Sequence, residues 1–354
     1  MSFQLSFEPT SNKGPIAVIK DSDESKFVYL VDSKGNDNKH VIPKKGIVDS
    51  LGLRYFFDLY SEIKDGPRAY KLKKGLKNED LSILSEALKK QDPEILDESN
   101  NSIILEKMYK QAMIDCQNIT NNKQIDLEDD SFVELVPPVL IGSKKSGCEF
   151  IPTRTCLYIT GPSGSGKTTL TGKFVKMFHK MFPGSPVYLF SELDEDPVLD
   201  KIKCIRRIKI GENLIEEPIE IKDLEGPEIG NSGKKTSLVI FDDIDVIKDK
   251  KVREQVYKIQ DSLLQIGRHS EIYTVCTAHM MFNYQKTRIL LTECPFVTFF
   301  PKSGATWQIE RFLKAHIGLN KKQMKKIFDL PSRWVTIYKN YPMYVIHEHG
   351  IYLL

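Results

Sequence analysis

The stretch that decides the fold is CLYITGPSGSGKT, residues 156–168. Its first five residues are a β-prone, mostly apolar run, and a helical pattern follows the loop as far as Phe182. The three glycines between them, at positions 161, 164 and 166, let the backbone curl into a nest of inward-pointing N–H groups. The positive end of the following helix adds to this nest. We therefore predict a phosphate-binding loop between a buried strand and a helix.

The spacing of the loop also assigns chemistry to its last residues. Lys167 is placed to reach the β- and γ-phosphates of a nucleotide, and the Thr168 hydroxyl is placed to bind Mg²⁺. Thr169 is the alternative metal ligand. We expect ATP with Mg²⁺ to be held by Gly161, Pro162, Ser163, Gly164, Ser165, Gly166, Lys167, Thr168 and Thr169.

A second motif, LVIFDD at residues 238–243, ends a buried apolar run in two carboxylates. We predict that Asp242 is the second Mg²⁺ ligand. Asp243 follows it and is predicted to orient or deprotonate an attacking water, with Asp245 as the alternative. Ordinary capping of the next turn would explain such carboxylates without any chemistry.

Polar side chains also follow a further strand, at residues 272–277. Thr277 and His279 then arrive at the carboxyl edge of the sheet, where open α/β sheets bind ligands. We expect both residues to sense the γ-phosphate. Arg268, at the end of the preceding helix, is a candidate arginine finger that stabilises the transferring phosphoryl group, and Arg288 competes for this role.

The wider pattern predicts an α/β fold. Five short apolar runs alternate with helices, which is typical of a mainly parallel sheet covered on both faces. We expect a P-loop NTPase core of five or more strands at 132–354, ending in a C-terminal β-hairpin. Residues 1–131 are predicted to form an accessory α+β region with strands near 16–19 and 27–31 and helices near 80–88 and 103–108. The core strands are expected at 156–160, 187–190, 238–241, 272–277 and 296–300, with a helix at 252–266.

Composition limits the class of protein. The chain has 354 residues with 40% hydrophobic content, enough for a packed core. It has no apolar window of membrane-spanning length, and its first residues do not resemble a secretion signal, so we expect a cytosolic protein. Six scattered cysteines without a C-x-x-C pair disfavour a zinc site and a disulfide framework.

Charge is distributed unevenly along the chain. Residues 1–150 carry 21 Lys and Arg against 25 Asp and Glu, whereas residues 151–354 carry 30 against 23. The segment 320–328 is predicted to be a helix with Asn320 as its N-cap and an apolar stripe opposite four lysines. Such a face suits sequence-independent contact with nucleic acid phosphates, although a merely solvated lysine face is equally compatible. The four lysines are Lys321, Lys322, Lys325 and Lys326.

These motifs together resemble one family. With GRH at 267–269, TAH at 277–279, PKSG at 301–304 and LPSRW at 330–334, the chain is similar to the genome-packaging ATPases of nucleocytoplasmic large DNA viruses. Poxviruses and African swine fever virus carry such proteins, which belong to the FtsK–HerA superfamily. The resemblance covers about residues 135–354, and residues 1–130 resemble nothing familiar.

The resemblance implies a motor. It would be a homo-oligomeric ring that binds ATP between neighbouring subunits and draws double-stranded DNA into a preformed capsid, with viral capsid or portal-like proteins as partners. It would work at the assembly site in the host cytoplasm and could enter the virion, and Arg268 would act on the ATP of the next subunit. One departure concerns Asp243, because this superfamily usually has Glu there. A P-loop kinase of a small molecule and an ATP-gated structural virion component without turnover stay as alternatives.

Overall fold

The structure, a computed structural model, describes residues 3–21, 24–32, 78–90, 92–120, 122–127, 130–282, 287–303 and 306–354. The side chains of Arg268 and of several residues in the two N-terminal helices lie outside this description. The chain divides into two compact units. One unit is Met1–Phe7 with Asp32–Asp126, and the other is Glu8–Val31 with Leu127–Leu354.

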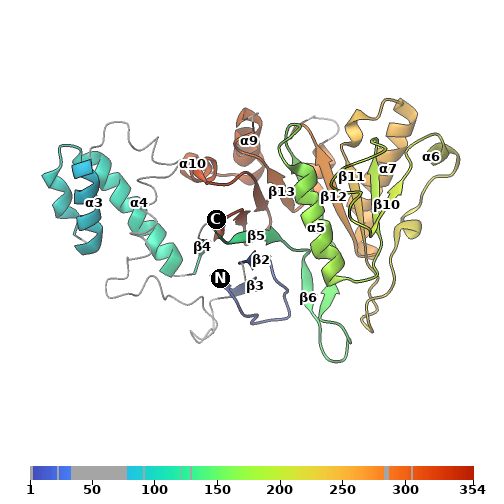
Figure 1. Cartoon of the computed structure of the whole chain (residues 1–354), viewed down its shortest axis with the longest axis horizontal. Helices are drawn as coiled ribbons and strands as arrows, with labels where there is room; N and C mark the ends of the chain where they lie inside the picture. Colours follow the sequence, from blue (N-terminus) through green and yellow to red (C-terminus); the bar gives the residue numbers. More distant parts are fainter. Residues whose placement is uncertain are drawn as a thin grey trace. The chain divides into compact units, whose positions relative to one another are not determined.

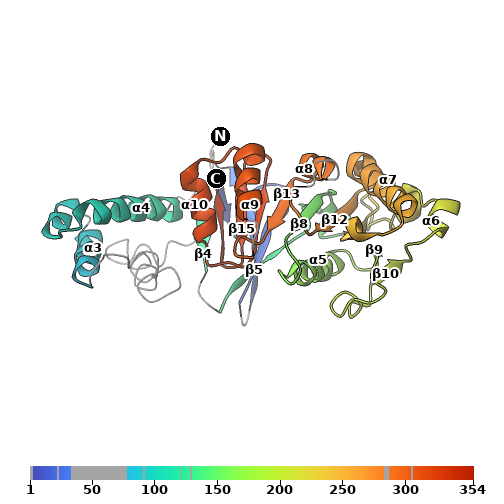
Figure 2. The same cartoon turned by 90° about the horizontal axis from the view of Figure 1, so that it is seen from above.

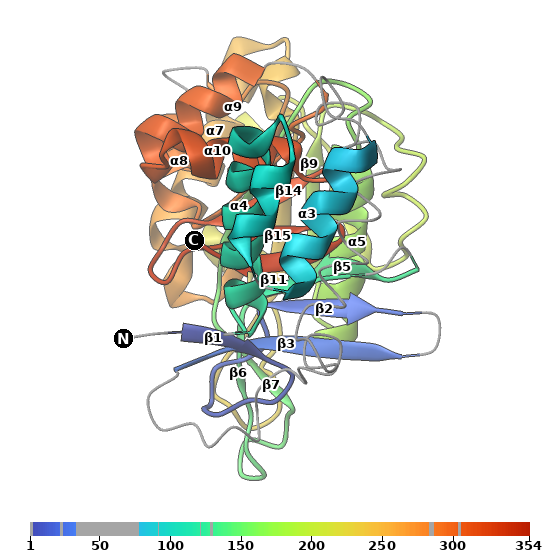
Figure 3. The ribbon, with the colours of Figure 1, turned by 90° about the vertical axis from the view of Figure 1, so that its left-hand side faces the viewer.

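The first unit contains a helical hairpin. Helices α3 (Asn78–Lys90) and α4 (Ser102–Thr120) pack side by side and are joined by η2 (Pro93–Glu98) (Figure 3). The buried carboxylate of Asp80 accepts hydrogen bonds from the Ser99 hydroxyl and, at 3.0 Å, from the Asn101 amide, so it ties the start of α3 to the start of α4. The unit also includes the short strands β1 (Phe3–Ser6) and β4 (Gln124–Asp126).

The second unit is built on a large sheet (Figure 1). Within this unit the strand order is β10, β9, β11, β12, β8, β13, β14, β15, β16. The pairs from β10 to β13 are parallel and the pairs from β13 to β16 are antiparallel. The strands are β8 (Cys156–Thr160), β9 (Val187–Ser191), β10 (Ile205–Ile208), β11 (Ser237–Asp242), β12 (Ile272–Ala278), β13 (Phe296–Phe299), β14 (Val335–Tyr338), β15 (Tyr344–His347) and β16 (Gly350–Leu353).

Helices cover both faces of this sheet. Seen from above in Figure 2, α5 lies on one side of the strands, and α7 and α8 lie on the other. This burial explains why every residue of β8, β11 and β12 is buried and why these strands read as continuous apolar runs. The helices are α5 (Lys167–Met181), α6 (Asn213–Glu216), α7 (Lys250–Ile266), α8 (Arg288–Glu293), α9 (Thr306–Phe312) and α10 (Lys321–Asp329), with short turns η3 (Ile221–Leu224), η4 (Ile244–Val246), η5 (Gly267–His269) and η6 (Leu313–Ile317).

Smaller strands complete the second unit. Strand β2 (Ala17–Lys20) pairs antiparallel with β3 (Ser25–Asp32) and β5 (Phe132–Leu135), and β6 (Val139–Ile141) pairs with β7 (Phe150–Pro152). Pairing with β5 therefore brings a segment near the N-terminus into the unit that carries the large sheet. The predicted domains divide at 131/132, whereas the compact units divide at 126/127 and place Glu8–Val31 with the second unit.

The predicted fold class is confirmed. The mainly parallel sheet has helices on both faces, and antiparallel strands follow at the C-terminus. The expected hairpin is part of a three-stranded antiparallel extension, β14 to β16. None of the helices in the described residues is long and apolar enough to cross a membrane.

Candidate active site

The glycine-rich loop follows the carboxyl end of β8, a strand that lies between β12 and β13 in the sheet. The Gly161 N–H donates to the Ala278 carbonyl at 3.1 Å, which fixes the start of the loop to the end of β12. A side chain at Gly161 would meet the Phe300 ring at 2.7 Å and the Ser165 hydroxyl at 2.8 Å. Gly166 has a φ of +106°, which favours glycine, and it is the N-cap residue of α5. The loop therefore needs glycine at both ends.

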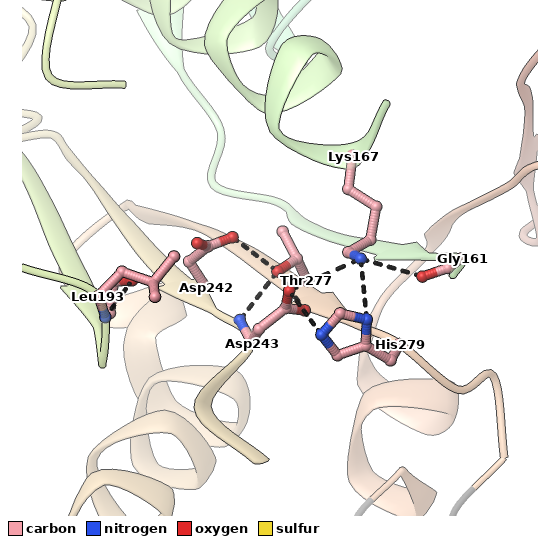
Figure 4. A network of polar contacts seen from close by, with 8 residues as sticks. Gly161, Lys167, Leu193, Asp242, Asp243, Thr277 and His279 are labelled. Carbon is pink, nitrogen blue, oxygen red and sulfur yellow. Dashed lines mark hydrogen bonds and ion pairs between the residues drawn. The ribbon is translucent and has the colours of Figure 1, made fainter. Parts of the chain in front are cut away.

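Lys167 extends from the first turn of α5 into a polar network (Figure 4). Its side chain is 6% exposed, and its ammonium donates to the Gly161 carbonyl at 3.0 Å. The same nitrogen lies 3.3 Å from His279 Nδ1 and 3.6 Å from Asp243 Oδ2. The structure thus brings together three of the residues that the sequence singled out for catalysis.

Thr277, near the end of β12, links the two carboxylates that end β11. Its hydroxyl lies 2.8 Å from Asp242 Oδ1 and 3.1 Å from Asp243 Oδ1, and it accepts the Asp243 backbone N–H at 2.9 Å. A hydroxyl has one hydrogen to donate, so the two carboxylates share it. Figure 4 shows Thr277 between them. Thr277 belongs to the same network as Lys167 and His279.

Asp242 is the more deeply buried of the two carboxylates. Burial raises its pKa above the ordinary value, the Thr277 hydrogen bond opposes this rise, and the negative charges of Asp243 and Asp196 add to it. A buried carboxylate with one hydroxyl donor is a strong ligand for a hard cation, because a cation removes the cost of burying its charge.

Asp243 has an unusual backbone conformation. Its φ of +45° and ψ of 40° lie in the left-handed region, which few residues other than glycine, Asn and Asp adopt. This turn directs its carboxylate toward the network, where Oδ2 also lies 3.1 Å from His279 Nε2. Residues in this region often mark functional sites, because the surrounding contacts must hold the strained conformation.

The residues present fit a nucleotide phosphate and a magnesium ion. The Ser165 hydroxyl is buried and has no hydrogen-bond partner in the described part of the chain, so it is available to a ligand within the loop. Thr168 is half-buried in the first turn of α5 and Asp242 is buried, and together they offer the hard oxygen ligands that Mg²⁺ prefers. Thr169 is exposed.

Among the described residues, the other predicted site residues lie outside the Lys167 network. Asp245 lines a cavity of about 30 Å³ with Thr277, Tyr257 and Thr287, and one of its carboxylate oxygens is buried with no hydrogen-bond partner in the described part of the chain. Arg268 lies in η5 after α7, and its side chain is outside the described residues. Arg288 is exposed at the first residue of α8.

Helix α10 forms where the sequence predicts it. Asn320 caps it by accepting from the Gln323 N–H at 3.0 Å, and the Gln323 side chain accepts from the Asn320 N–H. Met324 and Ile327 are buried. Three of the predicted DNA-binding lysines are exposed, whereas Lys326 is half-buried with its ammonium 4.3 Å from the centre of the Tyr352 ring. The exposed lysines are Lys321, Lys322 and Lys325.

Sequence reasoning missed three residues of the site. Ser191 ends β9 in register with Asp242, Asp196 contributes negative charge to Asp242, and the Phe300 ring packs against Gly161. The position of Ser191 at the end of a predicted strand beside the Asp242 strand was a usable indication. Nothing in the local pattern around Asp196 or Phe300 pointed to the site.

A related protein is known from a virophage. The chain is 41% identical over 199 residues to the uncharacterized protein V3 of Sputnik virophage, which is 56% of this chain and 76% of V3. The chain belongs to the family of this virophage protein. No protein-family model matches the chain. The more specific resemblance to the poxvirus and African swine fever virus ATPases stays a prediction.

Several solved structures are similar to part of the chain. The genome-packaging NTPase B204 of Sulfolobus turreted icosahedral virus 2, solved with ATP-gammaS, shares 13% identity at a TM-score of 0.36 and covers 56% of this chain and 97% of its own. The pCW3 conjugation coupling protein TcpA shares 14% identity at a TM-score of 0.38 and covers 64% of this chain and 66% of its own. Likenesses of this extent carry no conclusion about activity.

Proposed function

We propose that this chain is an ATPase that drives double-stranded viral DNA into a preformed capsid. The observation that carries the proposal is the Lys167 network, in which a P-loop lysine meets Asp243 and His279 beside the buried Asp242. A P-loop that only binds nucleotide needs the lysine and the glycines. Polar groups converging where the γ-phosphate would lie favour hydrolysis as well.

The roles follow from the positions of the side chains. Backbone N–H groups of the loop and the Ser165 hydroxyl cradle the phosphates, and Lys167 leaves its present acceptors to neutralise them. Thr168 and Asp242 would hold Mg²⁺, which when bound supplies positive charge to the phosphate oxygens. Thr277 and Asp243 complete the polar wall on the γ-phosphate side.

The DNA part of the proposal rests on charge, on relationship and on the motif resemblance. The exposed lysines of α10 give a basic helix face, and residues 265–340 carry 12 basic against 4 acidic residues. The relationship to a virophage protein fits a viral context. The same proposal includes a homo-oligomeric ring in which Arg268 acts on the ATP of the next subunit. It also includes capsid or portal-like partners and a site of action in the host cytoplasm.

DNA-stimulated turnover tests this function. The rate of phosphate release from ATP should rise when double-stranded DNA of unrelated sequences is added, and the stimulation should weaken as salt concentration rises. Turnover that does not respond to DNA at low salt would reject the motor while leaving an ATPase.

A kinase reading has less support. Such an enzyme needs a mobile arginine-bearing lid, and the arginines near the acidic stretch 192–233 are Arg206 and Arg207. Arg207 is held by Asp200 at 2.6 Å and by the Leu193 carbonyl at 2.6 Å. Transfer of labelled γ-phosphate to a nucleoside or nucleotide instead of to water would favour the kinase.

A further inference from the structure

His279 bridges the P-loop lysine and the carboxylate that was predicted to activate water. Its Nδ1 lies 3.3 Å from Lys167 Nζ and its Nε2 lies 3.1 Å from Asp243 Oδ2. The side chain is 33% exposed, and Figure 4 shows its ring between Lys167 and Asp243. The ring thus has one nitrogen on the phosphate side and one on the carboxylate side.

The chemistry of the two neighbours fixes the proton on the ring. A lysine ammonium can only donate, so Nδ1 must accept from Lys167 and carries no hydrogen. The hydrogen of the neutral ring is then on Nε2, which donates to Asp243. His279 therefore has an unprotonated, basic nitrogen directed at the place of the lysine head group.

More donors face the Asp243 carboxylate than face His279 Nδ1. Oδ2 lies beside both His279 Nε2 and the Lys167 ammonium, and Oδ1 shares the Thr277 hydroxyl. When phosphates draw Lys167 away, His279 Nδ1 loses the donor that faces it, whereas Asp243 keeps the donors from His279 and Thr277.

We propose that His279 is the general base of ATP hydrolysis and that Asp243 is a positioning residue that holds its ring. The proposal rests on the ATPase function argued above. The water oxygen bonds to the γ-phosphorus, and the bond from that phosphorus to the β–γ bridging oxygen breaks with its electron pair leaving on ADP. The water proton passes to Nδ1, and Asp243 stabilises the resulting imidazolium through Nε2–H. The imidazolium then returns its proton to phosphate or solvent.

Substitution with chemical rescue tests the proposal. His279→Ala should lower kcat by about 10²-fold to 10⁴-fold, the range of general base catalysis, while binding of a fluorescent ATP analogue persists. Added imidazole should restore part of the rate. His279→Asn is a second variant. It should also lose turnover, because the amide is not basic, and it leaves a smaller cavity than alanine does. His179→Ala, at an exposed histidine in the last turn of α5, is the matched control and should turn over as wild type with no response to imidazole.

The outcomes are separable from those of the proposed function. A wild-type protein that releases no phosphate refutes the ATPase itself. If the wild type turns over and folded His279→Ala and His279→Asn match it, the histidine is not the base. A loss of rate that imidazole does not restore would also overturn the proposal.

Discussion

Gly161 occupies a position where even one methyl group lacks room. An added Cβ would lie 2.7 Å from the Phe300 ring and 2.8 Å from Ser165 Oγ, in a loop whose N–H is tied to β12. We expect Gly161→Ala to destabilise the protein by about 1–3 kcal/mol, as overpacking does, and to weaken nucleotide affinity by displacing the loop. Thermal unfolding and titration with an ATP analogue measure the two effects. The control is Ser163→Ala, at an exposed position of the loop that contains Gly161, and it should leave stability near wild type.

Asp242 illustrates a conflict between stability and function. The residue is 5% exposed, and burial raises its pKa, so the folded state holds the proton more tightly than the unfolded state does. The stability this gives is full at low pH and is lost as pH rises through the raised pKa. Asp242→Asn should therefore stabilise the nucleotide-free protein at neutral pH, with a smaller gain at acid pH.

The same substitution should abolish Mg²⁺-dependent turnover, because the amide is a weaker ligand for a hard cation. Melting curves across a pH series, beside phosphate release, measure both consequences. A melting temperature that falls at neutral pH would show that the buried charge is compensated in the free protein.

Residue types and positions along the chain single out several members of the candidate site, but not their contacts. Lys167, Asp242 and Thr277 follow from where apolar runs end at one edge of a parallel sheet. The Asp243–His279 contact depends on a left-handed turn at Asp243, and no sequence pattern shows such a turn at a non-glycine residue.

At the scale of elements, helix α10 is the clearest test of DNA contact. Replacing Lys321, Lys322 and Lys325 together with alanine should weaken binding to DNA of any sequence and lower the steepness of its salt dependence by up to about 3, at about one phosphate for each lysine. Binding isotherms at several salt concentrations measure both quantities. The alternative of a solvated face predicts no change in either.

A matched control removes the same charge elsewhere. Lys176 on α5 and Lys251 and Lys258 on α7 are exposed, and their triple alanine variant should retain the wild-type salt dependence. Equal losses in the two triple variants would indicate a response to net charge rather than a binding face.

Elements were predictable where burial is uniform. Strands β8, β11 and β12 read as apolar runs because the sheet buries both of their faces. Strand β10 was not predicted, since it is an edge strand whose sequence IRRI contains two arginines and has no fully buried position. Short α8 and α9 also escaped prediction, because six or seven residues are too few for a helical period to be evident.

At the scale of the whole molecule, the N-terminal segment shows what local patterns cannot give. Strand β2 pairs with β5 in a register that joins Ala17 to Leu135, a contact across more than a hundred residues. Propensity predicts β2 but neither β5 nor the pairing between them, so the predicted boundary at 131/132 could not assign Glu8–Val31 to the second unit.

We predict that this protein assembles into an oligomer in which subunits share active sites. If Arg268 acts on a neighbouring subunit, Arg268→Ala should retain ATP binding while losing turnover by about 10³-fold, and mixing it with Lys167→Ala should restore part of the activity. Light scattering with an ATP analogue and DNA should show an oligomer. A persistent monomer under all of these conditions would contradict a trans-acting arginine.

Hydrolysis of ATP by this chain is measured as steady-state phosphate release from ATP with Mg²⁺ by the wild type, by Lys167→Ala and by Lys176→Ala, an exposed lysine of the same helix. We predict sustained release by the wild type and by Lys176→Ala, and a loss of about 10²-fold to 10³-fold in Lys167→Ala. A wild-type protein that binds ATP but releases no phosphate, or a Lys167→Ala variant that retains the wild-type rate, would contradict the ATPase function.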